Sequence, residues 1–431
     1  MARIMMSAMP FAGHARPVRA VAAELVRRGH DVRVSTAASY AAGFEGVGAR
    51  VVPWAAAPDV DERDLAATFP RLRDRKGFRQ VLINLEDLFL GTAPAQYTDL
   101  LAAHAHEPWD LLAGDPMALG TRFAAERLRT PWATVSPIAY WPPGDGIPPT
   151  GLGLTPATGP AGRARDAVLG SVSRAGTAAL TRRYRRTRRE VGLPPDAVGF
   201  ADIWYSPELV VAAGAPGLDY PRHDLPAHVR FVGDLTDDGR PGPAVDPPPW
   251  WDDVLRAEVP VVHVTQGTAN VDPRDLILPA LAALADQDVL VVVGLGHRTD
   301  PLPVPLPANA RAAPMLPYPE LLPRTSVMIT NGGYGAVLQA LRHDVPLVVA
   351  GGDLDKPEIA ARVGWHGAGV DLRTGTPRPA AVGEAYRRVA GDPSFRAAAA
   401  RLGAEIRGLG GTRAAADLLE RHLPGRPTLS G

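Results

Sequence analysis

A glycine-rich segment, residues 330–335 (TNGGYG), has the composition of an anion-binding turn. It lies between an apolar run typical of a strand and a run with helical spacing. Glycines at such a turn let backbone N–H groups approach an anion closely, and the start of the following helix adds a favourable dipole. The segment therefore predicts a diphosphate site, in which Asn331 either donates to a phosphate oxygen or caps the turn. A turn of this kind can also serve packing alone.

An acidic residue followed by a basic one, Asp355 and Lys356, comes after the next apolar run. Ligands of open parallel sheets bind at the carboxyl ends of the strands. A carboxylate at this edge can accept hydrogen bonds from sugar hydroxyls, while Lys356 can donate to them or meet a phosphate. Asp355 can also be the N-cap of a helix over residues 356–363, with Pro357 in its first turn. Both roles can coexist, since a cap uses only part of the hydrogen-bonding capacity of a carboxylate.

Parallel strands must position these residues, and the first half of the chain predicts one set of them. Its apolar runs, each typical of a strand, are residues 4–8, 31–35, 111–114, 132–135 and 209–212. Residues 17–28 have the apolar spacing of a helix, which stops at Gly29. The alternation of strand, helix and strand predicts parallel βαβ units in a doubly wound sheet.

A second αβ series follows a stretch rich in Pro, Gly and Asp, which we interpret as an interdomain connection. Its expected strands are residues 261–265, 289–293, 327–330 and 347–350, and its expected helices are residues 279–284, 335–342 and 356–363. Residues 395–423 predict a helical tail. The expected parts are an N-terminal acceptor-binding domain (1–214), a linker (215–250), a C-terminal donor-binding domain (251–405), and a helix and tail (406–431) that packs back on the first domain.

Two further segments have simpler interpretations. Residues 142–160 are rich in Pro and Gly and should form an exposed loop. Residues 182–189 contain six arginines. We favour a solvated helix face, ended by Gly192 and Pro194, over an anionic-ligand site. The pair Gly294 and Gly296 predicts a strand-end turn rather than a dinucleotide fingerprint, because no third glycine follows.

The composition excludes several classes of function. The chain has 431 residues, which favours two or three domains, and its 46 basic and 46 acidic residues give a formal net charge of zero. A nucleic-acid binder would usually show a basic excess. The absence of cysteine excludes disulfides, thiolate metal sites and cysteine nucleophiles. The N-terminus lacks signal-peptide features and no segment predicts a membrane span, so we expect a cytoplasmic protein without stable membrane insertion.

Residues 331–371 resemble the donor-binding signature of the family 1 inverting glycosyltransferases, which include plant secondary-metabolite glucosyltransferases and bacterial antibiotic and macrolide glycosyltransferases. Three other segments agree with this resemblance. Residues 13–32 (GHARP at their start) resemble the acceptor-side motif, residues 264–268 (VTQGT) the turn that opens the C-terminal domain, and residues 307–318 the loop beside the nucleotide base. The similarity runs along nearly the whole chain, except for residues 139–188, which in this family shape the acceptor pocket.

The resemblance implies a GT-B fold, in which two Rossmann-like domains with doubly wound parallel sheets face each other across a cleft. It also implies inverting transfer of a sugar from a UDP- or TDP-sugar to a hydrophobic natural-product acceptor, with no metal and no further cofactor. His14 corresponds to the general base, because a neutral imidazole can take a proton from the attacking acceptor. Asp115 is the candidate for orienting His14 and stabilising its imidazolium. Without the resemblance, His14 would be interpreted as a helix-cap histidine and Asp115 as a turn residue before Pro116.

The same resemblance implies how the donor is held. Backbone N–H groups near Asn331 would stabilise the leaving diphosphate, Thr268 would bind it from the opposite turn, and the backbone around Tyr318 would meet the base. The expected donor-binding residues are Gly13, Gly267, Thr268, Pro317, Tyr318, Asn331, Gly332, Gly333, Tyr334, Gly335, Asp355 and Lys356. Asn331 stands where many members have histidine, and Lys356 where many have glutamine, which leaves the identity of the sugar open.

Two other functions use the same fold. One is a catalytically silent protein that activates a partner enzyme, against which the retention of His14, Asp115 and the diphosphate turn argues. The other is a different GT-B enzyme, such as a sugar epimerase or a lipid-linked cell-wall transferase, against which the neutral charge argues. We expect a monomer or homodimer whose partners are a nucleotide sugar and a small hydrophobic acceptor, and not nucleic acid.

Overall fold

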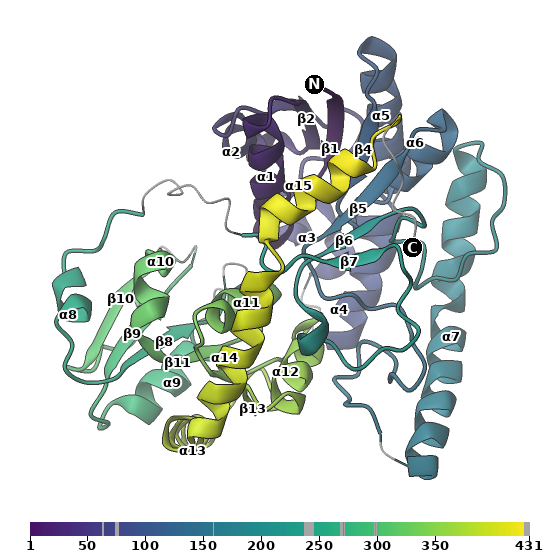
Figure 1. Cartoon of the computed structure of the whole chain (residues 1–431). Coiled ribbons are helices and arrows are strands. Elements are labelled where there is room, and N and C mark those ends of the chain that lie inside the picture. The colour runs from purple at the N-terminus through teal and green to yellow at the C-terminus, as the bar shows by residue number, and fades with distance from the viewer. Residues whose placement is uncertain are drawn as a thin grey trace.

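Two parallel β-sheets form the centres of two α/β lobes (Figure 1). The computed structural model describes residues 1–425 apart from residues 63, 74–76, 158, 237–244, 268, 269, 271, 297 and 299. In spatial order the first sheet contains β3 (Arg50–Pro53), β2 (Asp31–Thr36), β1 (Arg3–Ser7), β4 (Leu111–Gly114), β5 (Trp132–Ser136), β6 (Val210–Ala212) and β7 (Val229–Phe231). The second contains β10 (Ala310–Ala313), β9 (Leu290–Gly294), β8 (Val261–Thr265), β11 (Thr325–Thr330), β12 (Leu347–Val349) and β13 (Gly369–Asp371). All the neighbouring pairs are parallel, which confirms the expected α/β class.

Helices cover these sheets. Those of the first lobe are α1 (Ala12–Arg27), α2 (Ala41–Glu45), α3 (Leu65–Thr68), α4 (Gly77–Ile83), α5 (Ala93–His106), α6 (Gly120–Leu128) and α7 (Gly159–Glu190), with the π-helix η3 (Asn84–Leu90). The later helices are α8 (Trp251–Leu255), α9 (Ile277–Leu284), α10 (Tyr318–Leu321), α11 (Tyr334–Arg342), α12 (Lys356–Trp365), α13 (Pro379–Gly391), α14 (Pro393–Gly408) and α15 (Gly411–Arg421). Short 3-10 turns are η1 (Ala38–Tyr40), η2 (Pro70–Leu72), η4 (Pro216–Leu218) and η5 (Leu322–Arg324). None of the described helices is long and apolar enough to cross a bilayer.

The strands that the sequence predicts are all present, and each begins and ends within two residues of the expected position. They are the central strands of the two sheets, buried on both faces, and such strands are continuous apolar runs. The four strands that the sequence did not reveal, β3, β7, β10 and β13, are the edge strands. An edge strand has a neighbouring strand on one side only, so it is less completely covered and needs no continuous apolar run.

The first helix begins earlier than expected. Residue 17 was expected at its start, but α1 begins at Ala12 and contains Pro17 in its interior. Because proline has no N–H, the carbonyl group of Gly13 receives no helical hydrogen bond from residue 17. The early start also places His14 in the first turn of α1. The first turn of α1 faces the other lobe, so the early helix start places the His14 side chain between the lobes.

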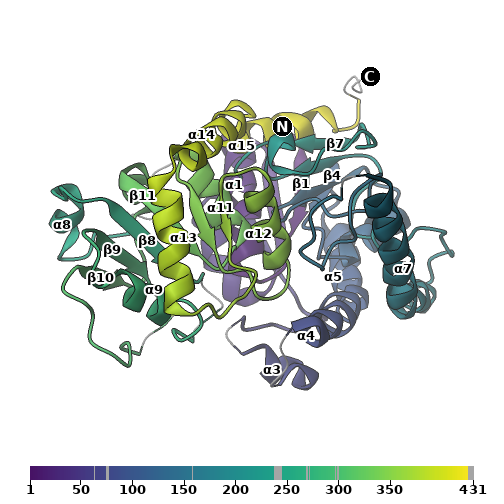
Figure 2. The same ribbon diagram turned by 90° about the horizontal axis from the view of Figure 1, so that it is seen from below.

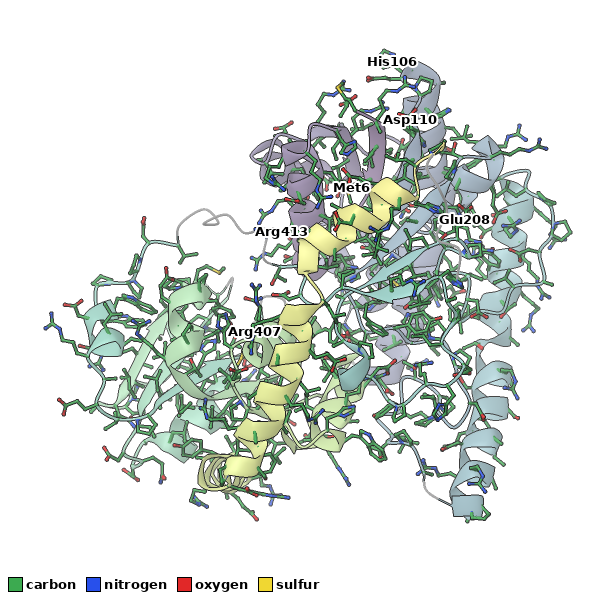
Figure 3. The ribbon with its side chains drawn as sticks, viewed as in Figure 1. Met6, His106, Asp110, Glu208, Arg407 and Arg413 are labelled. Atoms are coloured by element: carbon green, nitrogen blue, oxygen red, sulfur yellow. The ribbon has the colours of Figure 1, made fainter. Side chains whose placement is uncertain are left out.

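The expected helical tail is two helices, α14 and α15, separated by a break at Gly410, whose φ is +86°. Arg407 and Arg413 lie on the two sides of this break (Figure 3). After the break, α15 lies against the first lobe (Figure 1). There Arg28, the C-cap residue of α1, pairs with Asp417 at 2.5 Å and with Glu420 at 3.0 Å. The last helix of the chain therefore covers the first one.

The arginine-rich segment lies in α7 as expected, but the expectation of a fully solvated face is wrong for Arg188. This side chain is buried, pairs with Glu126 of α6 at 2.7 Å, and donates to the carbonyl oxygen of Pro194 at 2.7 Å. An arginine can be buried when its charge and N–H groups are satisfied in this way. Arg188 therefore fixes the C-terminal end of α7 to the lobe.

The two lobes meet around α1, α11 and α12 (Figure 2). One buried apolar cluster includes Val18 and Val21 of α1 together with Val337 and Leu338 of α11. The ring of Tyr334 belongs to the same cluster, and its Oη donates to the carbonyl oxygen of Ala213 in the first lobe at 3.1 Å. The lobes therefore share a hydrophobic core beside the cavity that separates them elsewhere.

Candidate functional site

A cavity of about 2570 Å³ opens between the lobes. Side chains and backbone from both lobes line it, and they include most of the residues that the sequence predicts for the site. The predicted residues on its wall are Gly13, His14, Gly267, Pro317, Tyr318, Asn331, Gly333, Tyr334, Gly335, Asp355 and Lys356. Asp115 and Gly332 lie outside the lining, and Thr268 lies outside the described residues. The fold thus brings the imidazole of one lobe and the glycine-rich turn of the other to one cavity.

His14 and Asp115 meet because each follows a central strand of the first sheet. Strands β1 and β4 are direct neighbours, so the residues after their carboxyl ends lie side by side. His14 Nδ1 is 2.7 Å from Asp115 Oδ2. The Asp115 side chain is fully buried, and it also accepts backbone N–H bonds from Met9 (3.2 Å) and Met117 (2.9 Å). The fixed carboxylate assigns the proton to Nδ1 and leaves Nε2 of His14 for a ligand.

Acidic groups from both lobes act on His14. Burial has the largest single effect and lowers the pKa of this imidazole, but the charge and hydrogen bond of Asp115 and the charges of Asp355 and Glu62 together outweigh it. The pKa therefore lies above its ordinary value of 6.5. Glu62 itself accepts the N–H of Ala12 at 2.8 Å, at the start of α1. Asp355 belongs to the second lobe and lines the same cavity as His14.

The glycine-rich turn connects β11 to α11. Gly332 has a φ of +87°, and a Cβ atom there would lie 2.9 Å from Cγ1 of Val349, so only glycine fits. Asn331 is buried, and its amide nitrogen donates to the backbone oxygen of Gln266. Its Oδ1 accepts the N–H of Gly333 at 3.3 Å. Asn331 therefore caps the turn and ties it to the residues after β8.

Tyr334 and Gly335 contribute backbone to this turn. The Tyr334 side chain points into the shared core and bonds to Ala213, so it is not available to a ligand. A Cβ on Gly214, whose φ is +100°, would lie 2.0 Å from Tyr334 Oη, which shows how closely the lobes approach. The first N–H groups of an α-helix have no partner within the helix, and Gly333 and Gly335 line the cavity at the start of α11.

Asp355 occupies the N-cap position of α12, but its carboxylate accepts no hydrogen bond from the helix. The side chain is open to the cavity and surrounded by protein, which raises the pKa of this carboxyl above its ordinary value, while the charges of Lys356 and His14 oppose the rise. Lys356 pairs through Nζ with Asp353. The oxygens of Asp355 are thus not used for capping.

Comparison with known proteins identifies the family of the chain. Residues 279–409 match the family model described as "Erythromycin biosynthesis protein CIII-like, C-terminal domain". The chain is 39% identical over 422 residues to a 4'-demethylrebeccamycin synthase of Lentzea aerocolonigenes, covering 97% of this chain and 99% of the relative. It is 32% identical to UDP-glucosyltransferase B1 of Starmerella bombicola over 94% of each protein. The chain belongs to the antibiotic- and macrolide-type glycosyltransferases of family 1.

Solved structures share the fold of this glycosyltransferase. The glycosyltransferase of kitacinnamycin superposes with a TM-score of 0.76 at 25% identity, covering 98% of this chain and 99% of that one. A calicheamicin glycosyltransferase superposes with a TM-score of 0.74 at 23% identity, covering 99% and 100%. The expected GT-B fold is therefore confirmed, and the protein is an enzyme of the glycosyltransferase class.

A buried histidine of this glycosyltransferase, His263, holds Tyr318 in place. Tyr318 ends the loop that the resemblance predicts to lie beside the nucleotide base. His263 lies in β8, and its Nδ1 is 2.9 Å from the carbonyl oxygen of Val292, so Nδ1 must donate. Its Nε2 then accepts from Tyr318 Oη at 2.9 Å. Burial lowers the pKa of His263 to about 4, which keeps the ring neutral. Sequence reasoning missed His263, although a single histidine inside an apolar strand is a visible signal.

The other half of the glycosyltransferase cavity is aromatic. The ring of Phe11 lies 6.0 Å from that of His14 and 6.4 Å from that of Phe89. The contacts continue from Phe89 to Trp204 at 6.4 Å and from Trp204 to Trp141 at 6.2 Å. Phe89 lies in the π-helix η3, an element that is frequent at functional sites. An apolar wall therefore extends from the imidazole into the first lobe.

The raised pKa of His14 leads to a prediction for the pH dependence. A general base must be neutral, so kcat/KM should rise with pH and reach half its plateau above pH 6.5 in the wild type. In Asp115→Asn the raising charge is gone while the burial remains, so the midpoint should move to lower pH. An NMR titration of the His14 ring in both proteins checks the shift directly. A midpoint that is unchanged or higher in Asp115→Asn would contradict the assigned pair.

Proposed function

We propose that this enzyme transfers a sugar, with inversion, from a UDP- or TDP-sugar to a hydrophobic natural-product acceptor, with His14 as general base and without a metal ion. The observation that carries the proposal is the shared cavity, in which His14 faces Asp355 and the turn at Asn331. The names of the relatives, a demethylrebeccamycin synthase and UDP-glucosyltransferases, support the same reaction class.

The acceptor is activated from the first lobe. Nδ1 of His14 donates to Asp115, so Nε2 takes the proton of the acceptor as its nucleophilic atom attacks the anomeric carbon. The buried Asp115 carboxylate stabilises the imidazolium that forms. His14 and the diphosphate turn belong to opposite lobes, which is compatible with attack of the acceptor on the face away from the leaving group. Attack on that face inverts the anomeric centre.

The leaving group is stabilised from the second lobe. As the glycosidic bond breaks, negative charge develops on the diphosphate. The backbone N–H groups of the first turn of α11, which follows Gly333, meet that charge together with the dipole of the helix. Asp355 accepts hydrogen bonds from sugar hydroxyls with oxygens that the helix does not use. The backbone around Pro317 and Tyr318, which line the cavity, is proposed to hold the base.

The opposite wall supports the proposed acceptor class. Phe11, Phe89 and Trp141 line the cavity on the side of His14, and a hydrophobic acceptor buries apolar surface against them. Polar side chains such as Glu62, Asn84 and Asp202 line the same side and can bind the polar groups of an acceptor. A hydrophobic small molecule with one nucleophilic group near its edge fits this wall.

The test is a transfer assay with purified enzyme, a panel of UDP- and TDP-sugars, and a panel of apolar acceptors. The matching donor should also raise the melting temperature, since a ligand at 100 times its Kd stabilises a native protein by about 2.7 kcal/mol. Glycoside should form at the same rate in EDTA, and NMR should show the anomeric configuration opposite to that of the donor. Activity lost in EDTA and restored by Mg²⁺, or a product with retained configuration, would contradict the proposal.

A further inference from the structure

A single carboxylate of the second lobe holds three consecutive backbone N–H groups of the first. Oε1 of Glu358, in α12, accepts from Gly151 at 2.8 Å, from Leu152 at 3.0 Å and from Gly153 at 2.8 Å. The Glu358 side chain is only 5% exposed. The two partners are more than 200 residues apart in the chain. This contact joins the two lobes at the wall of the cavity, which Leu152 and Glu358 both line.

The conformation of residues 151–153 suits an anion. Gly151 has a φ of +98° and Gly153 a φ of +59°. Left-handed residues in such a sequence turn successive N–H groups toward one point, which forms an anion-binding nest. The nest belongs to the loop between β5 and α7, which was expected to be simply exposed. Gly151 and Leu152 are exposed as expected, but the backbone N–H groups of the nest donate to the carboxylate of the other lobe.

Glu358 has no spare oxygen for a substrate. Its Oε2 pairs with Arg362 at 3.2 Å, and Arg362 in turn pairs with Asp219 of the first lobe at 3.2 Å. A Cβ on Gly153 would lie 3.0 Å from Cβ of Pro357, so the loop also packs on the first turn of α12. Both oxygens of the carboxylate therefore serve the contact between the lobes.

We propose that Glu358 is a positioning residue for glycosyl transfer, which couples the acceptor-side loop to the helix that carries Asp355 and Lys356. Residues three apart on a helix are neighbours, so Glu358 lies one turn from Asp355. On the other side of the contact, the loop leads back to Trp141 and Ile138, which line the acceptor side. The clamp formed by Glu358 and residues 151–153 sets the position of the acceptor relative to the sugar. This role rests on the function proposed above.

The experiment compares Glu358→Ala with the wild type and with Glu384→Ala, which removes an exposed carboxylate from α13. In Glu358→Ala the transfer kcat/KM for the acceptor should fall by about 100-fold, the typical cost of misplacing a reactant by 1 Å. The Kd for the free nucleoside diphosphate and the rate of donor hydrolysis by water should stay as in the wild type. Hydrogen–deuterium exchange at residues 151–153 should become faster. Glu384→Ala should match the wild type in every measurement.

Two results would overturn the clamp: unchanged exchange at residues 151–153 in Glu358→Ala, or equal losses of acceptor turnover and nucleotide binding. If Glu358→Ala does not fold, Glu358→Gln and Gly153→Ala replace it. The glutamine of Glu358→Gln retains one oxygen, which cannot accept from both Arg362 and the N–H groups of residues 151–153. The added methyl group of Gly153→Ala distorts the nest. Both variants should therefore show the same pattern as Glu358→Ala, but more weakly. Failure of the proposed function looks different. In that case the wild type forms no glycoside, while exchange at residues 151–153 still depends on Glu358.

Discussion

Replacement of His14 by alanine should lower kcat for transfer by ~10²–10⁴-fold, the usual contribution of a general base. The acceptor is a poor nucleophile until the imidazole of His14 removes its proton. Asp115 is hydrogen-bonded to that imidazole and holds it in place. In this variant the buried Asp115 carboxylate remains, but the imidazole that accepts the proton of the acceptor is gone. Binding of the nucleoside diphosphate should persist, because the residues proposed to hold it belong to the other lobe.

The matched control is His343→Ala. This histidine also lines the cavity, but burial lowers its pKa, and its ring makes no ion pair with a carboxylate among the described residues. Transfer should continue in this variant at close to the wild-type rate. Steady-state assays with saturating donor and isothermal titration with nucleoside diphosphate measure the two effects. Turnover retained in His14→Ala would remove His14 from the mechanism.

Asp355→Ala should weaken binding of the nucleotide sugar by about 1.5–3 kcal/mol, the range for hydrogen bonds to a charged group, and leave the affinity for free nucleoside diphosphate unchanged. The reason is that its carboxylate is open to the cavity and caps nothing. The fall corresponds to a loss of at least tenfold in affinity. Competition titrations with the sugar donor and with the free diphosphate separate the two affinities.

Asp392→Ala is the matched control for Asp355→Ala. Both residues occupy the N-cap of a helix with proline in its first turn, but Asp392 does cap, accepting the N–H of Ser394 at 2.9 Å. Its removal should cost about 1 kcal/mol of stability and leave donor binding intact. The stability of Asp355→Ala should change little. If Asp355→Ala lost stability and weakened both ligands equally, Asp355 would be a structural cap instead.

The sequence predicted the parts of the fold that depend on local composition. Central parallel strands are covered on both faces and must be apolar, so β1, β4, β8 and β11 were visible. The glycine-rich turn was visible because a left-handed position such as Gly332 admits few other residues. His14 and Asp115 were named from the resemblance, and the pairing of β1 with β4 brings them together.

The rest depends on contacts between residues far apart in the chain, which leave no periodic signal. Glu358 follows Asp355 and Lys356 in the sequence, but nothing near it indicates that its partners are residues 151–153. Tyr334 was grouped with the donor site, yet its ring lies in the core shared by the lobes. Arg188 was one of six similar arginines in the sequence. Its partners in space, Glu126 and the carbonyl oxygen of Pro194, allow this arginine to be buried.

The contact between α1 and α15 has a consequence for biosynthesis. Arg28 is separated from its partner Asp417 by 389 residues and from Glu420 by 392. A ribosome makes α1 long before α15, so the apolar face of α1 stays without this cover until α15 has been made. We expect the nascent first lobe to need chaperones during this interval. A chain shortened before residue 411 would retain the complete set of proposed active-site residues and still fail to mature.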